Sequence, residues 1–305
     1  MNDKLKDMLE YYRTQSELSD PGDFDYLYEG LPDDIPSLIK AVQNVILHFF
    51  WVYTDQNYGI SLKDIASTGR NPNEEHNLRK ISDRLAKFVA LKDEPIIVPR
   101  EFTERTVGNC RDYSLLLISI LRHKGIPARE RSGVASYLHP PPKKFFEDHF
   151  VCEYWNEEEQ KWFLVDAQID DLQRKAMKVT FDTCDVPRDG FLGAGLSWTK
   201  IREGKIAPEQ IGVGPYLGEK FARYKLIQDL ASINKIEVMA WEHWGIWSSS
   251  EELTPELYEM MDKLAQDITN SGDPEIFFKL KELFENDIIF KVPENYKYNT
   301  ANFDY

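Results

Sequence analysis

The sequence predicts an α+β protein in which helical segments flank a central group of short strands. Apolar residues recur at the spacing of packed helices at both ends of the chain. Between these ends, short runs rich in β-branched and aromatic residues predict strands at 129–137, 149–155 and 161–166. A chain of 305 residues with 42% hydrophobic residues can bury a core without disulfide or metal support.

The same pattern divides the chain into three parts. We expect a helical N-terminal flank over 1–95, a central core over 96–185 and a mainly helical C-terminal flank over 186–305. Composition does not change sharply at either boundary, so the three parts are expected to form one compact body.

Helices are predicted from apolar spacing and from their end signals. In the first flank the spacing predicts helices over Ser37–Tyr53 and Leu78–Val89. The central helix, Cys110–Lys124, should end at Gly125 because glycine suits the position after a helix and Pro127 cannot continue it. In the last flank, Thr254 and Asp273 each precede a proline, which predicts two helix starts. From Pro293 the tail is rich in Asn and Tyr and should form a surface strap or fray.

Charge and cysteine content exclude several classes of function. The net charge is −15 and the pI is near 4.9, so the surface repels phosphate and argues against binding to nucleic acid or anionic lipid. The most apolar run, Val45–Tyr53, is far shorter than the ~20 residues of a membrane span. Three cysteines form a poor disulfide framework and indicate a reducing compartment. We therefore expect a cytoplasmic protein, with no metal site because CxxC, HExxH and EF-hand motifs are absent.

Three residues together indicate thiol chemistry. Cys110 lies at a predicted helix start, where unpaired amides and the helix dipole favour a thiolate. His149 begins one predicted strand and Asp166 ends the next, and the turn Asn156–Gln160 should join the two as an antiparallel hairpin. An imidazole can take the thiol proton, and a carboxylate can orient the imidazole. The backbone N–H of Cys110 would be one oxyanion-hole donor, and the sequence leaves the second donor open.

The register of the hairpin tests this triad. Opposed residues of an antiparallel pair have a constant sum of residue numbers and share a face of the sheet. His149 and Asp166 share a face only if that sum is odd, as when Tyr154 pairs with Lys161. We expect this odd register, with Asp166 directly opposite His149. The same parity turns Asp148 and Cys152 to the other face, so Asp148 is rejected as the orienting carboxylate.

The residues around this constellation resemble a known family. The segments are Gly108–Arg129 (GNCRDYSLLLISILRHKGIPAR), Asp148–Trp155 (DHFVCEYW) and Lys161–Asp170 (KWFLVDAQID). Together they resemble the transglutaminase-like superfamily of papain-like thiol enzymes, in a bacterial branch. The resemblance covers roughly Val98 to Asp170 and matches the order Cys, His, Asp.

This resemblance implies a papain-like core in which a nucleophile helix packs on an antiparallel sheet. It implies Cys110 as nucleophile, His149 as base and Asp166 as orienter. The superfamily contains peptidases, amidases, acyltransferases and inactive scaffolds, so three functions stay open. We favour hydrolysis of an amide, ester or thioester through an acyl-enzyme, without a cofactor, on a small-molecule, peptide or protein acyl donor. The alternatives are transfer to an amine acceptor and an inactive interaction module.

Several other residues have both a functional and a structural interpretation. Asp112 either stabilises the first helical turn or contacts a substrate amine. Trp241, Trp244 and Trp247 surround His243 and form either core or a substrate wall. The glycine-rich run Asp185–Trp198 and the proline-rich loop Leu138–Glu147 could line the cleft. The residues predicted as possible substrate-lining positions are Asn109, Asp112, Trp198, His243 and Trp244.

Overall fold

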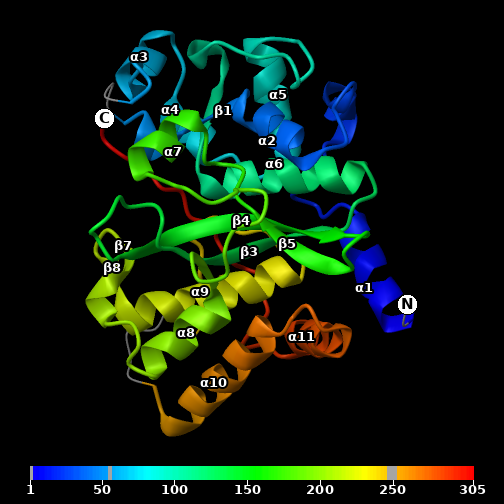
Figure 1. Ribbon diagram of the computed structural model, residues 1–305, viewed down its shortest axis with the longest axis vertical. Helices are drawn as coiled ribbons and strands as arrows, with labels where there is room; N and C mark the ends of the chain where they lie inside the picture. Colours follow the sequence, from blue (N-terminus) through cyan, green and yellow to red (C-terminus); the bar gives the residue numbers. More distant parts are fainter. Residues whose placement is uncertain (1–2, 54–56, 246–252) are drawn as a thin grey trace.

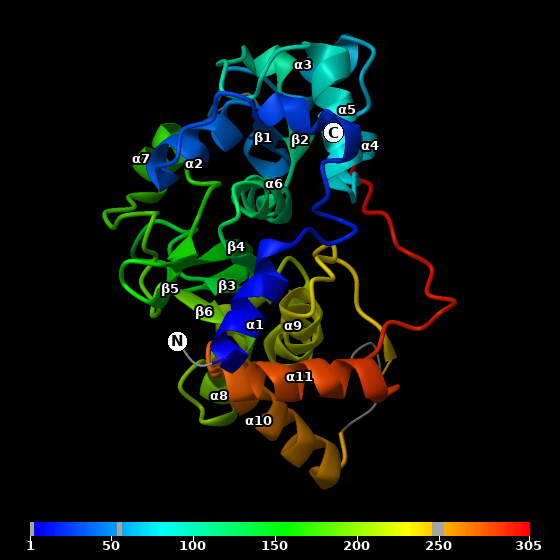
Figure 2. The ribbon, with the colours of Figure 1, turned by 90° about the vertical axis from the view of Figure 1, so that its right-hand side faces the viewer.

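The computed structural model describes residues 3–53, 57–245 and 253–305, and it arranges them in three layers (Figures 1 and 2). A mixed sheet occupies the middle. Helices α2 to α6 cover one side of the sheet, while α8 to α11 cover the other, where α1 packs against α11. The long tail after α11 runs from the second helical layer back to the first, and so links the two ends of the molecule (Figure 2).

The first helical layer is built mainly by residues before the sheet. The central helix α6 packs against β4 and β3, and α2, α5 and the turn η1 pack over it. The elements of this layer, with one helix from the sheet connections, are α2 (Ile35–Gln43), η2 (Phe49–Trp51), α3 (Leu62–Ser67), α4 (Pro72–His76), α5 (Ile81–Leu91), η1 (Gly22–Tyr28), η3 (Phe102–Glu104), α6 (Cys110–His123) and α7 (Asp171–Met177).

The second helical layer is built by the C-terminal flank. Helix α9 packs against β3, and α8 and α10 pack against α9 and each other. The elements of this side are α1 (Asp3–Arg13), η4 (Pro208–Gln210), α8 (Ala194–Arg202), α9 (Gly218–Ile233), α10 (Pro255–Thr269) and α11 (Pro274–Asn286). The predicted caps are confirmed, because Thr254 and Asp273 accept backbone hydrogen bonds at the starts of α10 and α11.

The sheet has six strands in the order β6-β3-β4-β7-β8, with β5 also paired to β4. One edge of β4 is paired along its length by antiparallel β3. The other edge is shared, because β7 pairs only with residues 146–147 and β5 only with residues 152–156. His149 therefore lies where this second edge of β4 carries no strand. The strands are β3 (Ala128–Ala135), β4 (Phe146–Asn156), β5 (Lys161–Val165), β6 (Phe191–Gly193), β7 (Ile211–Val213) and β8 (Tyr216–Leu217).

The β4–β5 hairpin has the odd register that the sequence predicts, but the predicted pair is wrong by two residues. Lys161 lies opposite Asn156 rather than Tyr154. The turn is tighter because the Asn156 side chain accepts hydrogen bonds from the amides of Glu158 and Glu159. His149 and Asp166 therefore share a face but lie diagonally instead of directly opposite each other.

The predicted helix Ser37–Tyr53 is wrong in its second half. The helix α2 ends at Gln43, and the chain continues as strand β1 (Ile46–His48). This strand pairs in parallel with β2 (Thr106–Gly108), so that His48 lies beside Gly108. The three residues of β1 are buried, and a short run that is apolar on all sides has no periodicity to distinguish strand from helix.

Candidate active site

The start of α6 holds Cys110 in a fixed position. Asn109 is the N-cap residue, and its side-chain oxygen accepts a hydrogen bond from the backbone N–H of Arg111 at 2.9 Å. In return, Asp112 accepts one from the backbone N–H of Asn109 at 2.8 Å. This reciprocal capping satisfies amides that a helix start otherwise leaves unpaired, and it leaves Cys110 at the positive end of the helix dipole.

A buried ion pair supports this helix start from behind. The carboxylate of Asp112 lies 2.9 Å from the guanidinium of Arg84 on α5 and 3.3 Å from that of Arg111, and all three side chains are almost fully buried. Gly108 is required here because a Cβ would come within 2.8 Å of the Asp112 carboxylate. Asp112 does not line the cavity, so of its two interpretations the structure favours stabilisation of the first helical turn.

His149 and Asp166 form the second half of the site. Nε2 of His149 lies 2.8 Å from Oδ2 of Asp166, and both side chains are buried. Asp166 follows β5 directly, and it also accepts hydrogen bonds from the hydroxyl of Tyr137 at 2.7 Å and from the backbone N–H of Gln168 at 3.0 Å. These three bonds fix the carboxylate, and the carboxylate in turn fixes the plane of the imidazole.

The local charges favour a protonated imidazole. Burial alone would lower the pKa of His149, but the Asp166 carboxylate and the adjacent Cys110 outweigh it and raise that pKa to about 10. Burial likewise opposes ionisation of Asp166, yet the bonds from His149 and Tyr137 keep its pKa below the ordinary value. At neutral pH the imidazole is therefore protonated and can stabilise a negative charge beside it.

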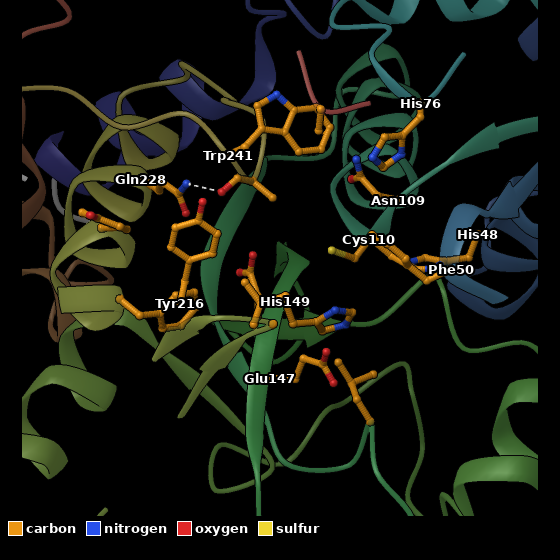
Figure 3. A pocket seen from close by; sticks show the side chains of 18 of the residues that line it. His48, Phe50, His76, Asn109, Cys110, Glu147, His149, Tyr216, Gln228 and Trp241 are labelled. Atoms are coloured by element: carbon orange, nitrogen blue, oxygen red, sulfur yellow. Dashed lines mark hydrogen bonds between the residues drawn. The ribbon is translucent and has the colours of Figure 1, made fainter. Parts of the chain in front are cut away.

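Cys110 and His149 meet at a cavity of about 800 Å³ (Figure 3), and Asp166 does not line it but bonds to His149. Cys110 and His149 lie on its wall, with the sulfur directed toward the open space. Most of the other lining groups are aromatic or apolar. They include Phe50, Trp51, Leu138, Met177, Val213, Tyr216, Phe221, Tyr224, Trp241 and Phe303, together with polar residues that include Glu147, Asp148, Lys225 and Gln228.

Of the predicted lining residues, Asn109 and His243 lie at the cavity, and His243 stacks on Tyr224 at 4.1 Å. Trp198 and Trp244 do not. Each is buried in the core of the second helical layer, with its indole N–H bonded to Asp262 and to the carbonyl of Phe290, respectively. Of the tryptophan series it is Trp241 that lines the cavity, while Trp247 lies outside the described residues.

Of the two segments predicted to line the cleft, only the proline-rich loop does so. The ends of the proline-rich loop, Leu138 and Glu147, line the cavity. The glycine-rich run does not. It instead contributes to a separate cavity of about 420 Å³, which is also lined by residues of β3, β4 and β5. The residues from the run are Arg188, Phe191, Gly193, Gly195 and Leu196. Asp148 points away from Asp166, as predicted from parity, and pairs with Lys225 on α9.

Two histidines at the cavity were missed by the sequence analysis. His48 reaches it because β1 pairs beside β2, which leads directly into Cys110. Burial and the nearby His149 and His76 lower the pKa of His48 to about 3, and burial lowers that of His76 to about 4. Both rings are therefore neutral. Among the described residues, Nδ1 of His48 and both ring nitrogens of His76 have no hydrogen-bond partner.

The described residues contain no group of three or more His, Cys, Asp or Glu side chains arranged to hold a metal ion. Among the helices that the structure describes, none has the length and apolar character needed to cross a membrane.

A helix bearing a capped cysteine, packed on an antiparallel sheet that carries a bonded His–Asp pair, defines the class of papain-like α+β folds. Residues 64–167 match the family model of the transglutaminase-like superfamily. This similarity covers the core of the chain, which the helical flanks enclose. The matched range includes Cys110, His149 and Asp166.

Other comparisons are more distant. No curated protein matches the chain. A solved structure named "a Putative Cysteine Protease from Cytophaga hutchinsonii" is 18% identical, with a TM-score of 0.29. The match covers 60% of this chain and 44% of that chain, so less than half of the length of that protein is represented here. At this score the likeness adds nothing to the description of the fold.

Replacing Asp112 tests the support of the helix start. Asp112→Ala removes the cap and leaves the guanidinium of Arg84 buried without its partner, so we expect a loss of about 3–5 kcal/mol in the free energy of unfolding. Urea denaturation measures this loss. The matched control is Asp171→Ala, because Asp171 also begins a helix but is exposed, and this change should cost no more than about 0.5 kcal/mol. Equal effects of the two changes would contradict the structural role of Asp112.

Proposed function

We propose that this protein is a thiol-dependent acyl-transfer enzyme that forms an acyl-enzyme at Cys110 and then hydrolyses it. The observation that supports this most directly is that Cys110 and His149 line one cavity, with Asp166 bonded to His149 at 2.8 Å. The substrate would be an amide or peptide, an ester or a thioester. Three free cysteines and a thiol that must stay reduced fit a cytoplasmic enzyme.

The proposed reaction has two halves. The Cys110 thiolate attacks the carbonyl carbon, and a new S–C bond forms while the carbonyl oxygen takes up the negative charge. As the tetrahedral intermediate collapses, His149 gives its proton to the leaving amine, alcohol or thiol. In the second half, His149 removes a proton from water, which attacks the acyl carbon and releases Cys110. Asp166 holds the imidazole in orientation throughout and stabilises its charged form.

Two donors would stabilise the developing oxyanion. The first is the backbone N–H of Cys110 at the helix start. We assign the second to the neutral imidazole of His48, which lines the same cavity and is held beside Gly108 by the pairing of β1 with β2. A neutral donor is suited to this task because it does not compete with His149 for the thiolate.

Transfer to an amine is the alternative reaction of the same acyl-enzyme. Glu147 and Asp148, on the strand that carries His149, place acidic groups at the cavity and could attract an amine acceptor. Asp148 is already paired with Lys225, and Glu147 contacts His139, so hydrolysis remains the favoured reaction.

Alkylation tests the thiol site. We expect iodoacetamide at pH 6.5 to label Cys110 before Cys152 and Cys184, because burial raises the pKa of Cys152 and raises that of Cys184 to about 12. His149→Ala should slow the labelling of Cys110 by about 100-fold at this pH, since the proton acceptor is lost. The labelling rate of Cys110 in this variant should then increase with pH, as it does for an ordinary thiol. Peptide mass spectrometry of each thiol measures these rates.

The control for this experiment is His123→Ala, which removes an exposed histidine from the last turn of α6. The labelling of Cys110 should be unchanged in this variant. If Cys110 reacts no faster than the other two cysteines in the wild-type protein, the proposed thiolate is not formed. The remaining alternative, an inactive interaction module, would then be favoured.

Substitution of His48 separates oxyanion stabilisation from thiolate formation. His48→Phe keeps a ring of similar shape but removes the N–H donor, so kcat toward an activated aryl ester should fall by about 100- to 1,000-fold. The alkylation rate of Cys110 should stay within about two-fold, because the donor acts on the substrate oxygen. His48→Gln should restore part of kcat. A parallel loss of alkylation would show that His48 positions the thiol instead.

Product analysis separates hydrolysis from transfer. With an ester substrate and an added primary amine, we expect the free acid as the main product, because the acidic groups at the cavity already have partners. Mass spectrometry of the products measures the ratio of amide to acid. An amide fraction that rises to saturation with amine concentration would instead establish an acceptor site and overturn the preference for hydrolysis.

A further inference from the structure

Residues 299–303, here called the strap, cross the opening between the two helical layers. The tail leaves α11 on one side of the sheet and reaches α4 on the other (Figure 2). On the way, Thr300, Ala301, Asn302 and Phe303 line the cavity that contains Cys110. The strap is exposed or half-buried along its length, so it lies over the cavity and not within the core.

The strap is held through its backbone at alternate residues. The side-chain amide of Asn77 donates to the carbonyl of Ala301 at 2.8 Å and accepts from its N–H at 2.9 Å. Asn73 makes the same two bonds to Phe303, at 3.0 and 3.1 Å. The indole N–H of Trp241 donates to the carbonyl of Asn299 at 3.0 Å. These five bonds repeat every second residue, as the contacts of an extended strand do.

Such contacts do not depend on the side chains of the segment that is held. A carboxamide that pairs with both the N–H and the C=O of one residue recognises extended backbone of nearly any sequence. Selectivity comes from one side chain, Phe303, whose ring packs against three other rings. The distance between ring centroids is 5.2 Å to Phe49 and to Phe50, and 5.7 Å to His76. The arrangement is that of a peptide-binding cleft with one aromatic subsite.

A second observation indicates that this cleft serves a ligand. His76 lies under the strap between Phe49 and Trp241 and is fully buried, and among the described residues neither of its ring nitrogens has a hydrogen-bond partner. Next to it, the side-chain nitrogen of Asn109 also lacks a partner within the described part of the chain. Buried polar groups are normally bonded, so these groups are available to a polar ligand that enters at Cys110.

We propose that Asn73, Asn77 and Trp241 form a clamp for one extended peptide segment that leads into the cavity of Cys110. The strap occupies this clamp and so competes with a peptide ligand. The peptide class deepens the proposed function, since it makes an acyl donor of peptide type the substrate. The clamp itself binds backbone and does not need the thiol chemistry.

Binding of the strap's own sequence to the full-length protein tests the clamp. The probe is a fluorescein-labelled peptide with the sequence of residues 297–305, KYNTANFDY. The receiving protein carries Ala301→Pro and Phe303→Ala, which remove the Asn77-bonded N–H and the aromatic anchor from the strap and leave the clamp intact. Fluorescence anisotropy should show saturable binding that is at least ~10-fold tighter than binding to the wild-type protein.

The controls distinguish binding at the clamp from nonspecific binding of the peptide. Adding Asn73→Ala and Asn77→Ala to the released protein removes four hydrogen bonds and should weaken binding at least ~10-fold. Adding Asn270→Ala instead should have no effect, because the side chain of Asn270 donates to the carbonyl of Gln266 in α10, away from the clamp. A peptide with alanine at the position of Phe303 that binds as tightly as the probe, or equal binding with and without the clamp asparagines, would overturn the proposal.

A measurement on the wild-type protein covers the case in which the released variant fails to fold. Excess unlabelled peptide should displace the strap and speed amide hydrogen exchange at Ala301 and Phe303. Exchange that is unchanged at saturating peptide would overturn the proposal. Peptide binding without any acyl product would instead reject the proposed function and leave the clamp standing, so the two failures are distinguishable.

Discussion

The carboxylate of Asp112 is the group on which the arrangement of the site depends most. It caps α6, neutralises Arg84 and Arg111 in a buried environment, and permits only glycine at position 108. Each of these contacts fixes the chain immediately before or after Cys110. Cys110 is therefore held by a charged interaction that lies behind it and does not enter the cavity.

The placement of Cys110, His149 and Asp166 in the fold is well predicted by the sequence because its signals are local. The helix from Cys110 is marked by its apolar spacing and by Gly125, which adopts a φ of 74° after the helix end. The relation of His149 to Asp166 follows from the parity of one short hairpin, although the turn bonds of Asn156 shift the pairing by two residues. Local capping and strand alternation were sufficient to bring these groups together.

The walls of the cavity could not be predicted in the same way. His48 reaches the site through a parallel pairing with β2, and parallel pairing between segments some sixty residues apart leaves no periodic mark in a three-residue strand. Trp241 and Trp244 have similar neighbours in the sequence, yet Trp241 lines the cavity. Trp244 is buried, and its indole N–H donates to the carbonyl of Phe290. Which of the two faces the cavity is decided by packing against α9 and the tail, so it is a tertiary property.

Because the tail returns to the cavity, the aligned residues and the cavity wall come from different regions of the sequence. The reactive residues all lie between 110 and 166, on elements joined by short connections, whereas the cavity above them is closed by residues as far apart as 48 and 303. During synthesis the reactive residues can therefore assemble well before the last wall of the cavity is made. In the finished protein, a local opening of the tail would widen access to the thiol while the bonds that align His149 and Asp166 stay intact. Local opening of the tail would thus alter the part of the cavity that selects a substrate, whereas it would leave the alignment of His149 and Asp166 unchanged.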